Sequence, residues 1–152
     1  MITIIGIGSP VSGDEHGLHA VEQLAATATV QTGQPSPRWL PLERPGLNLL
    51  QAWQGADTVV LIDTLLNPQA TRPVQRIELD ELLQQATGLS SHDIGVAEAL
   101  AMARVLGQLP PRLLIYGIAV ADGKSASRDN WLQPLQQMLQ DDLHAAISFS
   151  HR

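Results

Sequence analysis

The 152-residue sequence contains no cysteine. This absence excludes disulfide bonds, thiolate metal sites and a cysteine nucleophile. Basic residues are also scarce: nine lysines and arginines stand against fifteen aspartates and glutamates, so the net charge is −6. An acidic chain of this kind is a poor match for nucleic acid or for an anionic membrane surface. We therefore expect neither to be its main partner.

Long apolar runs are missing as well. No stretch approaches the roughly 20 apolar residues that a membrane helix needs. The N-terminal apolar run has no basic segment before it and is too short for a signal peptide. These absences predict a soluble, cytoplasmic protein. A chain of this length is most simply one domain, covering residues 1–152, and it is large enough for a three-layer core.

Several motifs of well-known enzyme classes are also absent. Gly6 and Gly8 fit the start of G-x-G-x-x-G, but Val11 occupies the third glycine position and no Gly-Lys-Ser/Thr follows. There is no Gly-x-Ser-x-Gly elbow, no His-Glu-x-x-His helix and no paired Asp-Thr-Gly. A phosphate beside Asp14 and Glu15 would meet like charge, at a cost of about 4 kcal/mol per close pair at an effective dielectric constant of about 20. The glycine-rich turn therefore suits a cation or proton chemistry.

The sequence does contain an N-terminal strand–loop–helix unit with two adjacent carboxylates. Residues 2–7 form a β-branched run typical of a buried strand, and apolar residues recur at helical spacing from Leu18. Asp14 and Glu15 lie just before the predicted helix. Acidic residues are common in a first helical turn, where they cap free N–H groups, so a purely structural role is the alternative.

Strands and helices alternate along the rest of the chain. Strands are predicted at residues 38–43, 58–63, 74–79 and 112–118, and helices after Pro45-Gly46, at residues 80–86, after Ser90-Ser91 and from about Pro134 to Ile147. Pro41 places the 38–43 strand at a sheet edge, and Val105 is expected on the buried face of the helix that follows Ser91. Such alternation indicates an α/β fold with a mainly parallel sheet covered by helices on both faces.

Three ionisable residues are predicted at one edge of this sheet, because parallel sheets bind ligands outside the carboxyl ends of their strands. Glu15 lies just past the first strand, Asp63 is the last residue of the 58–63 strand, and His92 opens a helix. Neighbouring strands are about 4.8 Å apart, so these side chains can converge on one ion. Two carboxylates and an imidazole suit a divalent first-row transition metal without selecting nickel, zinc or manganese.

Each candidate also has a purely structural interpretation. An aspartate that ends a strand often hydrogen-bonds its own backbone, and His92 can be a simple neighbour of a capping serine. His16 is a candidate extra ligand, whereas His19 is expected to face solvent. The three tryptophans are predicted to pack in the core or at its rim: Trp39, Trp53 and Trp131. The residues alone therefore indicate a cation-binding or acid–base site.

Four motifs resemble those of the hydrogenase maturation proteases, endopeptidases that trim the C-terminal extension of the nickel–iron hydrogenase large-subunit precursor. They are Gly6-Ile7-Gly8-Ser9-Pro10 with Gly13-Asp14-Glu15, Leu61-Ile62-Asp63, Ser90-Ser91-His92, and Gly107, Pro110 and Gly117-Ile118. The motifs follow the family's order, and the resemblance runs from Ile2 to about Ile147. Glu15, Asp63 and His92 match the family's metal-recognising positions.

The resemblance implies a three-layer α/β/α sandwich around a twisted, mostly parallel five-stranded sheet. It also implies an aspartic-type endopeptidase that recognises Ni²⁺ carried by its partner, the nickel-loaded precursor; Cd²⁺ or Zn²⁺ would substitute in the isolated protein. Glu15, Asp63 and His92 would be both metal-recognising and catalytic. Two cleavage chemistries stay open: a carboxylate that activates water, or nickel that polarises the scissile carbonyl.

Two loops depart from the family's pattern. His16 and Gly17 follow the acidic pair, where the family usually has one glycine at once and a second two residues on. Glu43-Arg44-Pro45-Gly46 replaces a loop that usually contains paired glycines, and this stiffer loop bears on precursor preference. Two other functions stay open: a non-catalytic nickel-site binder or chaperone, and a small-molecule hydrolase or amidase on the same scaffold.

Overall fold

The computed structural model describes residues 1–8, 16–30, 33–43, 46, 48–66, 72–84, 91–120, 128–143 and 147–149. The strands are β1 (Ile2–Gly8), β2 (Ala28–Val30), β3 (Arg38–Glu43), β4 (Thr58–Leu66), β5 (Val74–Ile77), β6 (Arg112–Val120) and β7 (Ile147–Phe149). The helices are α1 (His16–Thr27), α2 (Asn48–Ala52), α3 (Leu79–Gln84), α4 (Ser91–Leu106) and α5 (Arg128–Asp142). Within these described ranges, no helix has the length and apolar character needed to span a bilayer.

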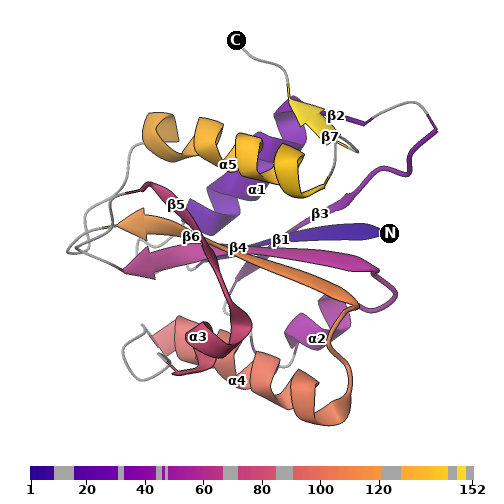
Figure 1. Ribbon diagram of the computed structural model, residues 1–152, viewed down its shortest axis with the longest axis vertical. Coiled ribbons are helices and arrows are strands. Elements are labelled where there is room, and N and C mark those ends of the chain that lie inside the picture. Colours follow the sequence, from indigo (N-terminus) through magenta and orange to yellow (C-terminus); the bar gives the residue numbers. More distant parts are fainter. Residues whose placement is uncertain are drawn as a thin grey trace.

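The main sheet has five strands in the order β3-β1-β4-β6-β5. The first four are parallel to one another and β5 is antiparallel. Helices α1 and α5 cover one face, and α2, α3 and α4 cover the other (Figure 1). The predicted α/β/α sandwich around a mostly parallel five-stranded sheet is confirmed, and Pro41 lies on the edge strand β3 as expected.

Side chains that alternate along the strands form two hydrophobic cores. Ile4 and Ile62 pack under α1 and α5, while Ile5 and Leu61 pack under the helices of the opposite face. Because both faces are covered, the central strands are apolar at nearly every position. The tryptophans lie where they were predicted: Trp131 in the first core, Trp53 in the second, and Trp39 partly buried against the first.

The start of α1 lies directly on the sheet, where two glycines leave the necessary room. A Cβ atom on Gly6 would lie 2.0 Å from the carbonyl oxygen of Gly17. A Cβ atom on Gly17 would lie 2.0 Å from the carbonyl oxygen of Ile7 and 2.6 Å from that of Ile62. Only glycine permits so close an approach of helix and strands. The backbone of β1 and β4 thus fixes where α1 begins.

Strand β4 is longer than predicted. Asp63 does not end it; the strand continues to Leu66, because β6 continues to Val120 and stays paired with it. Helix α5 also begins earlier than predicted, at Arg128, so Pro134 lies inside the helix and not in its first turn. A proline there removes one backbone hydrogen bond, which the packing of the surrounding helix on the core offsets.

The buried face of α4 also differs from the predicted one. Val105 is 83% exposed, so its expected place in the core is wrong. Among the side chains of α4 that the structure describes, from Gly95 on, the buried ones include three alanines, which let the helix approach the sheet closely. This set is Val96, Ala97, Ala99, Leu100 and Ala103. A second difference is a two-stranded sheet that was not predicted, in which β2 pairs antiparallel with β7.

A polar cluster ties the end of α5 to the sheet. Tyr116 is fully buried and donates its hydroxyl hydrogen bond to the carboxylate of Asp142, which also accepts from the guanidinium of Arg76. Arg112 donates to the backbone oxygen of Asp142 at 2.6 Å. Burial, reinforced by the bond to Asp142, raises the pKa of Tyr116 well above its usual range. The hydroxyl therefore stays protonated and has a structural role.

Candidate functional site

The neighbouring strands β1 and β4 lie where the winding of the sheet reverses. From β1 the chain passes through α1 to β3 on one side, and from β3 it passes through α2 to β4 on the other side. Helices α1 and α2 pack in the cores of opposite faces. In open α/β sheets, ligands bind at such a switch point, outside the carboxyl ends of the strands. The topology therefore selects the ends of β1 and β4 as the candidate site.

Asp63 is a half-buried carboxylate at this switch point. Strand β4 pairs with β1 only as far as Ile62, so Asp63 is the first residue of β4 beyond the paired region. Its Oδ1 accepts a hydrogen bond from the backbone N–H of Thr64 at 2.7 Å, which orients the carboxylate. Because side chains alternate along a strand, Asp63 shares the face of Leu61, on the side covered by α2, α3 and α4.

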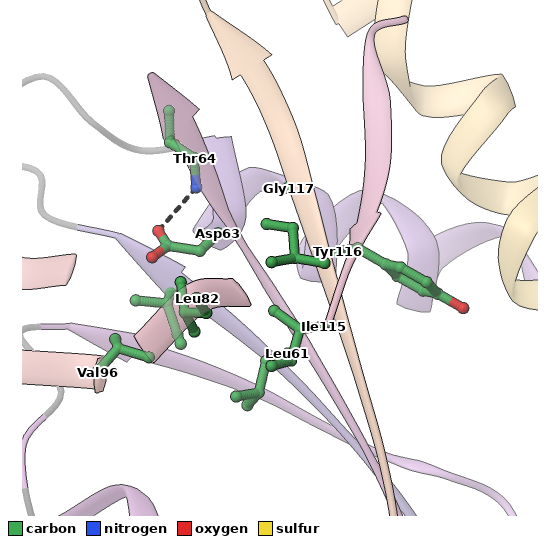
Figure 2. Close-up of a pocket in the computed structure, with 10 residues that line it drawn as sticks. Leu61, Asp63, Thr64, Leu82, Val96, Ile115, Tyr116 and Gly117 are labelled. Atoms are coloured by element: carbon green, nitrogen blue, oxygen red, sulfur yellow. Dashed lines mark hydrogen bonds between the residues drawn. The ribbon is translucent and has the colours of Figure 1, made fainter. Parts of the chain in front are cut away.

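An apolar pocket lies beside the Asp63 carboxylate. Its volume is about 390 Å³, with the space open to solvent included, and its walls are largely aliphatic. Figure 2 shows Asp63 next to Leu82, while the ring of Tyr116 points away from the pocket. The lining residues are Ile7, Leu61, Asp63, Thr64, Ile77, Leu82, Val96, Ile115, Tyr116 and Gly117. A charged group beside apolar walls interacts more strongly with a ligand charge than it would in open water.

Glu15 lies outside the described residues, so its place beside Asp63 stays a prediction. The residues that follow it are described. His16 is the first residue of α1, and Gly17 lies against the carbonyl oxygen of Ile62, the residue before Asp63. The chain therefore contacts the neighbour of Asp63 only two residues after Glu15.

His92 is the second residue of α4, and its side chain lies outside the described part of the structure. Val96, four residues later, is 4% exposed and lines the pocket with Asp63. Residues four apart share one face of a helix, so position 92 lies on the face of α4 that meets the pocket. Convergence of its imidazole with the two carboxylates stays a prediction.

The described side chains alone do not form the predicted metal site. Among them, no three histidines, aspartates or glutamates are grouped closely enough to hold an ion. Two of the three predicted ligands, Glu15 and the side chain of His92, are not in that set. Asp63 is the predicted ligand whose side chain the structure describes.

The two histidines of α1 differ in their surroundings. His19 is exposed, as predicted. His16 is half-buried, and its ring meets the ring of Trp131 edge to face, with centroids 6.5 Å apart and an interplanar angle of 83°. No sequence pattern links these two residues, because they belong to helices far apart along the chain.

The structural alternative for Asp63, a hydrogen bond to its own backbone, is present as the bond that Asp63 accepts from the N–H of Thr64. Sequence reasoning missed another feature of the site. The apolar pocket is assembled from several strands and helices. The spacing of Leu61 and Asp63 was a usable signal for it, because residues two apart on a strand share a face.

Fold and site together define an α/β protein with an oriented carboxylate at the switch point of a mostly parallel sheet. No protein-family model matches the chain. The chain is 30% identical over 120 residues to the hydrogenase expression/formation protein HupD of Thiocapsa roseopersicina, a match that covers 77% of the chain and 53% of HupD. It is 28% identical over 152 residues to the hydrogenase expression/formation protein HupM of Azotobacter chroococcum mcd 1, covering 97% of the chain and 70% of HupM. The chain thus spans about half the length of HupD.

Two solved structures share the fold. The hydrogenase maturating endopeptidase HybD from E. coli superposes with a TM-score of 0.66 at 18% identity, covering 97% of this chain and 94% of HybD. The [NiFe] hydrogenase maturation protease HycI from Thermococcus kodakarensis KOD1 gives 0.63 at 18% identity, covering 91% and 90%. The sequence similarity to hydrogenase expression/formation proteins and the fold shared with two maturation proteases agree with the resemblance of the motifs to the hydrogenase maturation protease family.

Proposed function

We propose that the protein is a cytoplasmic endopeptidase that removes the C-terminal extension of a nickel–iron hydrogenase large-subunit precursor. In this proposal it first recognises the nickel already inserted in the precursor. The observation that carries the proposal is the oriented carboxylate of Asp63 at the switch point between β1 and β4. The sequence similarity to HupD and the fold shared with HybD support the substrate class. Glu15 and His92 complete the proposed site.

The residues have distinct tasks in the proposed reaction. Two carboxylates and a neutral imidazole are donors that a divalent transition metal accepts, so Glu15, Asp63 and His92 can bind the nickel of the precursor. This binding places the peptide bond next to the metal beside the carboxylates. A carboxylate can then accept a proton from the attacking water, as in aspartic-type catalysis. Nickel would supply Lewis-acid polarisation of the scissile carbonyl.

Asp63 is the best-placed described group for the proton transfer. The Thr64 N–H holds one of its oxygens, which restricts rotation of the carboxylate. This bond favours a single reactive geometry over a mobile side chain. The pocket walls beside the carboxylate are largely aliphatic. Tyr116, whose raised pKa keeps it protonated and whose hydroxyl is bonded to Asp142, takes no part.

The experiment uses the precursor in two forms, nickel-loaded and nickel-free. Each form is incubated with the protein, and its intact mass is followed by mass spectrometry. We expect only the nickel-loaded precursor to lose the mass of its C-terminal extension, because the metal completes the recognition site.

Other outcomes separate the alternative functions. Equal cleavage of both forms would show that nickel is not recognised. A stable complex with unchanged precursor mass would indicate a nickel-site binder or chaperone. If the protein neither binds nor cleaves the precursor, the proposal is contradicted and a small-molecule hydrolase or amidase is favoured.

A further inference from the structure

Gly117 leaves a gap in the face of the sheet that carries Asp63. Strands β4 and β6 are parallel, and their register places Gly117 beside Asp63 and Ile115 beside Leu61. Because side chains alternate along a strand, these positions share the face that α2, α3 and α4 cover. Gly117 is the position among them that has no side chain to place there. The missing side chain helps to open the pocket, which Gly117 lines together with the other three residues.

The pocket has a charged rim and an apolar floor. Asp63 and Gly117 lie nearest to the carboxyl ends of their strands, and Leu61 and Ile115 precede them by two residues, one row of side chains deeper in the sheet. Figure 2 shows Leu61 and Ile115 below Asp63. Among the described residues that line the pocket, Asp63 alone carries a charge. A group that enters from the rim therefore meets aliphatic side chains at the floor.

The opening of the pocket is narrow. Leu82 of α3 and Val96 of α4 line it from the side of the helices. These two side chains are 8% and 4% exposed, and that of Ile115 is 5% exposed. Walls so little exposed to solvent suit a short aliphatic side chain, of the size of valine or smaller, better than an aromatic ring.

We propose that this pocket binds a short aliphatic side chain of the precursor, from a residue next to the peptide bond that is cleaved. The inference rests on the proposed function, because it takes the Asp63 carboxylate as the group that acts on that bond. An aliphatic side chain that enters beside Gly117 contacts Leu61 and Ile115 and leaves Asp63 at the rim. A basic side chain that reached the floor would lose its hydration without gaining a partner there. Gly117 is thus a specificity-determining residue.

The first experiment needs neither precursor nor metal. The probe is N-acetyl-L-valine N-methylamide, an aliphatic side chain between two peptide groups, and it is titrated into the full-length protein. The ¹³C–¹H signals of the methyl groups of Leu82, Val96 and Ile115 report on the pocket. We expect these signals to shift and to saturate with the valine derivative. The corresponding glycine, lysine and phenylalanine derivatives should leave them in place.

Two variants reduce the space in the pocket from opposite walls. Gly117→Val places an aliphatic group in the pocket itself, at a strand position that accepts a β-branched residue. Val96→Leu adds one methylene from the side of α4. Each should weaken binding of the valine derivative at least about tenfold, the scale on which an apolar pocket rejects one methylene too many. The matched control is Val105→Leu, the same change at an 83% exposed position of the same helix, which should bind like wild type.

The second experiment measures processing of the nickel-loaded precursor. Gly117→Val should lower kcat/KM at least about tenfold, because the side chain of the precursor no longer fits. The residues on either side of the scissile bond are then changed to glycine, one at a time. One of these two precursors should be processed by Gly117→Val as fast as by the wild type, since it needs no pocket. A general structural defect in Gly117→Val would instead slow all the precursors alike and would contradict the inference.

The probe and the precursor separate the inference from the proposed function. No shift with the valine derivative, or equal shifts with the glycine derivative, would overturn the inference. Larger shifts with the lysine derivative would also overturn it, because the pocket would then select a basic side chain. A wild type that binds the valine derivative but cleaves no precursor would contradict the proposed function and leave the selectivity of the pocket supported. A wild type that cleaves the precursor but ignores the valine derivative would contradict the inference alone.

Discussion

Glu15→Gln is expected to abolish processing of the nickel-loaded precursor while the protein melts near the wild-type temperature. The amide keeps the size and reach of the side chain but removes the negative charge that a metal ligand supplies. We expect the processing rate to fall at least about 100-fold, the scale seen when a charge-stabilising group is removed from an active site. The contacts that fix α1 are made by His16 and Gly17, so stability should change by no more than about 0.5 kcal/mol. Precursor mass against time and thermal unfolding give the two readouts.

Asp14→Asn is the matched control, because it removes the adjacent carboxylate, to which no metal role is assigned. It should process precursor normally. Asp63→Asn should fail like Glu15→Gln, with a small additional loss of stability because Asp63 is half-buried and accepts a hydrogen bond from Thr64. If Glu15 only caps α1, the pattern is reversed: a lower melting temperature with processing kept.

Gly17→Ala is expected to cause the largest loss of stability. The added methyl group would lie 2.0 Å from the carbonyl oxygen of Ile7 and 2.6 Å from that of Ile62, so α1 must move away from the sheet. Overpacking against backbone atoms that cannot rotate away should cost about 3 kcal/mol or more. For a chain of this size, that corresponds to a fall of about 6–12 °C in the melting temperature. Urea unfolding gives the free energy directly.

Gly46→Ala is the control for this substitution. The nearest atom to a Cβ at position 46 is 3.9 Å away, so the change should alter stability by no more than about 0.5 kcal/mol. If Gly17→Ala is as stable as Gly46→Ala, then α1 does not begin against β1 and β4. The predicted position of Glu15 next to the switch point would then lose its structural support.

The central strands of the sheet could be predicted because both of their faces are buried. Each face needs apolar side chains, so the strands appear in the sequence as short, nearly continuous β-branched runs. Pro41 marked β3 as an edge strand for a local reason. Proline has no backbone N–H to donate, whereas an inner strand forms hydrogen bonds with a neighbour on each side. Local chemistry was sufficient for these elements.

Elements defined by distant partners could not be predicted. Strands β2 and β7 have three residues each, too few for a periodic pattern, and they pair across almost the whole chain. Strand β4 extends beyond Asp63 because β6 extends beside it. The preference of proline for the first turn of a helix misplaced the start of α5, because packing on the core holds the turns that precede Pro134.

The candidate site likewise has a part that the sequence predicted and a part that only the structure shows. The rule for carboxyl ends of parallel strands placed Asp63 at the correct edge of the sheet from sequence alone. The apolar pocket and the contact between His16 and Trp131 depend on three-dimensional packing, whereas the bond from the Thr64 N–H to Asp63 is local. A sequence pattern can therefore indicate which residues meet at a site, but not the surfaces that distant elements build around them.

The three-residue metal site has a direct test in a crystal structure of the protein soaked in Cd²⁺, with the ion located by anomalous scattering. We expect one ion at the carboxyl ends of β1 and β4, coordinated by carboxylate oxygens of Glu15 and Asp63 and by a ring nitrogen of His92. A structure that places any of these side chains at the opposite edge of the sheet, or an ion bound without Asp63, would contradict the proposed site.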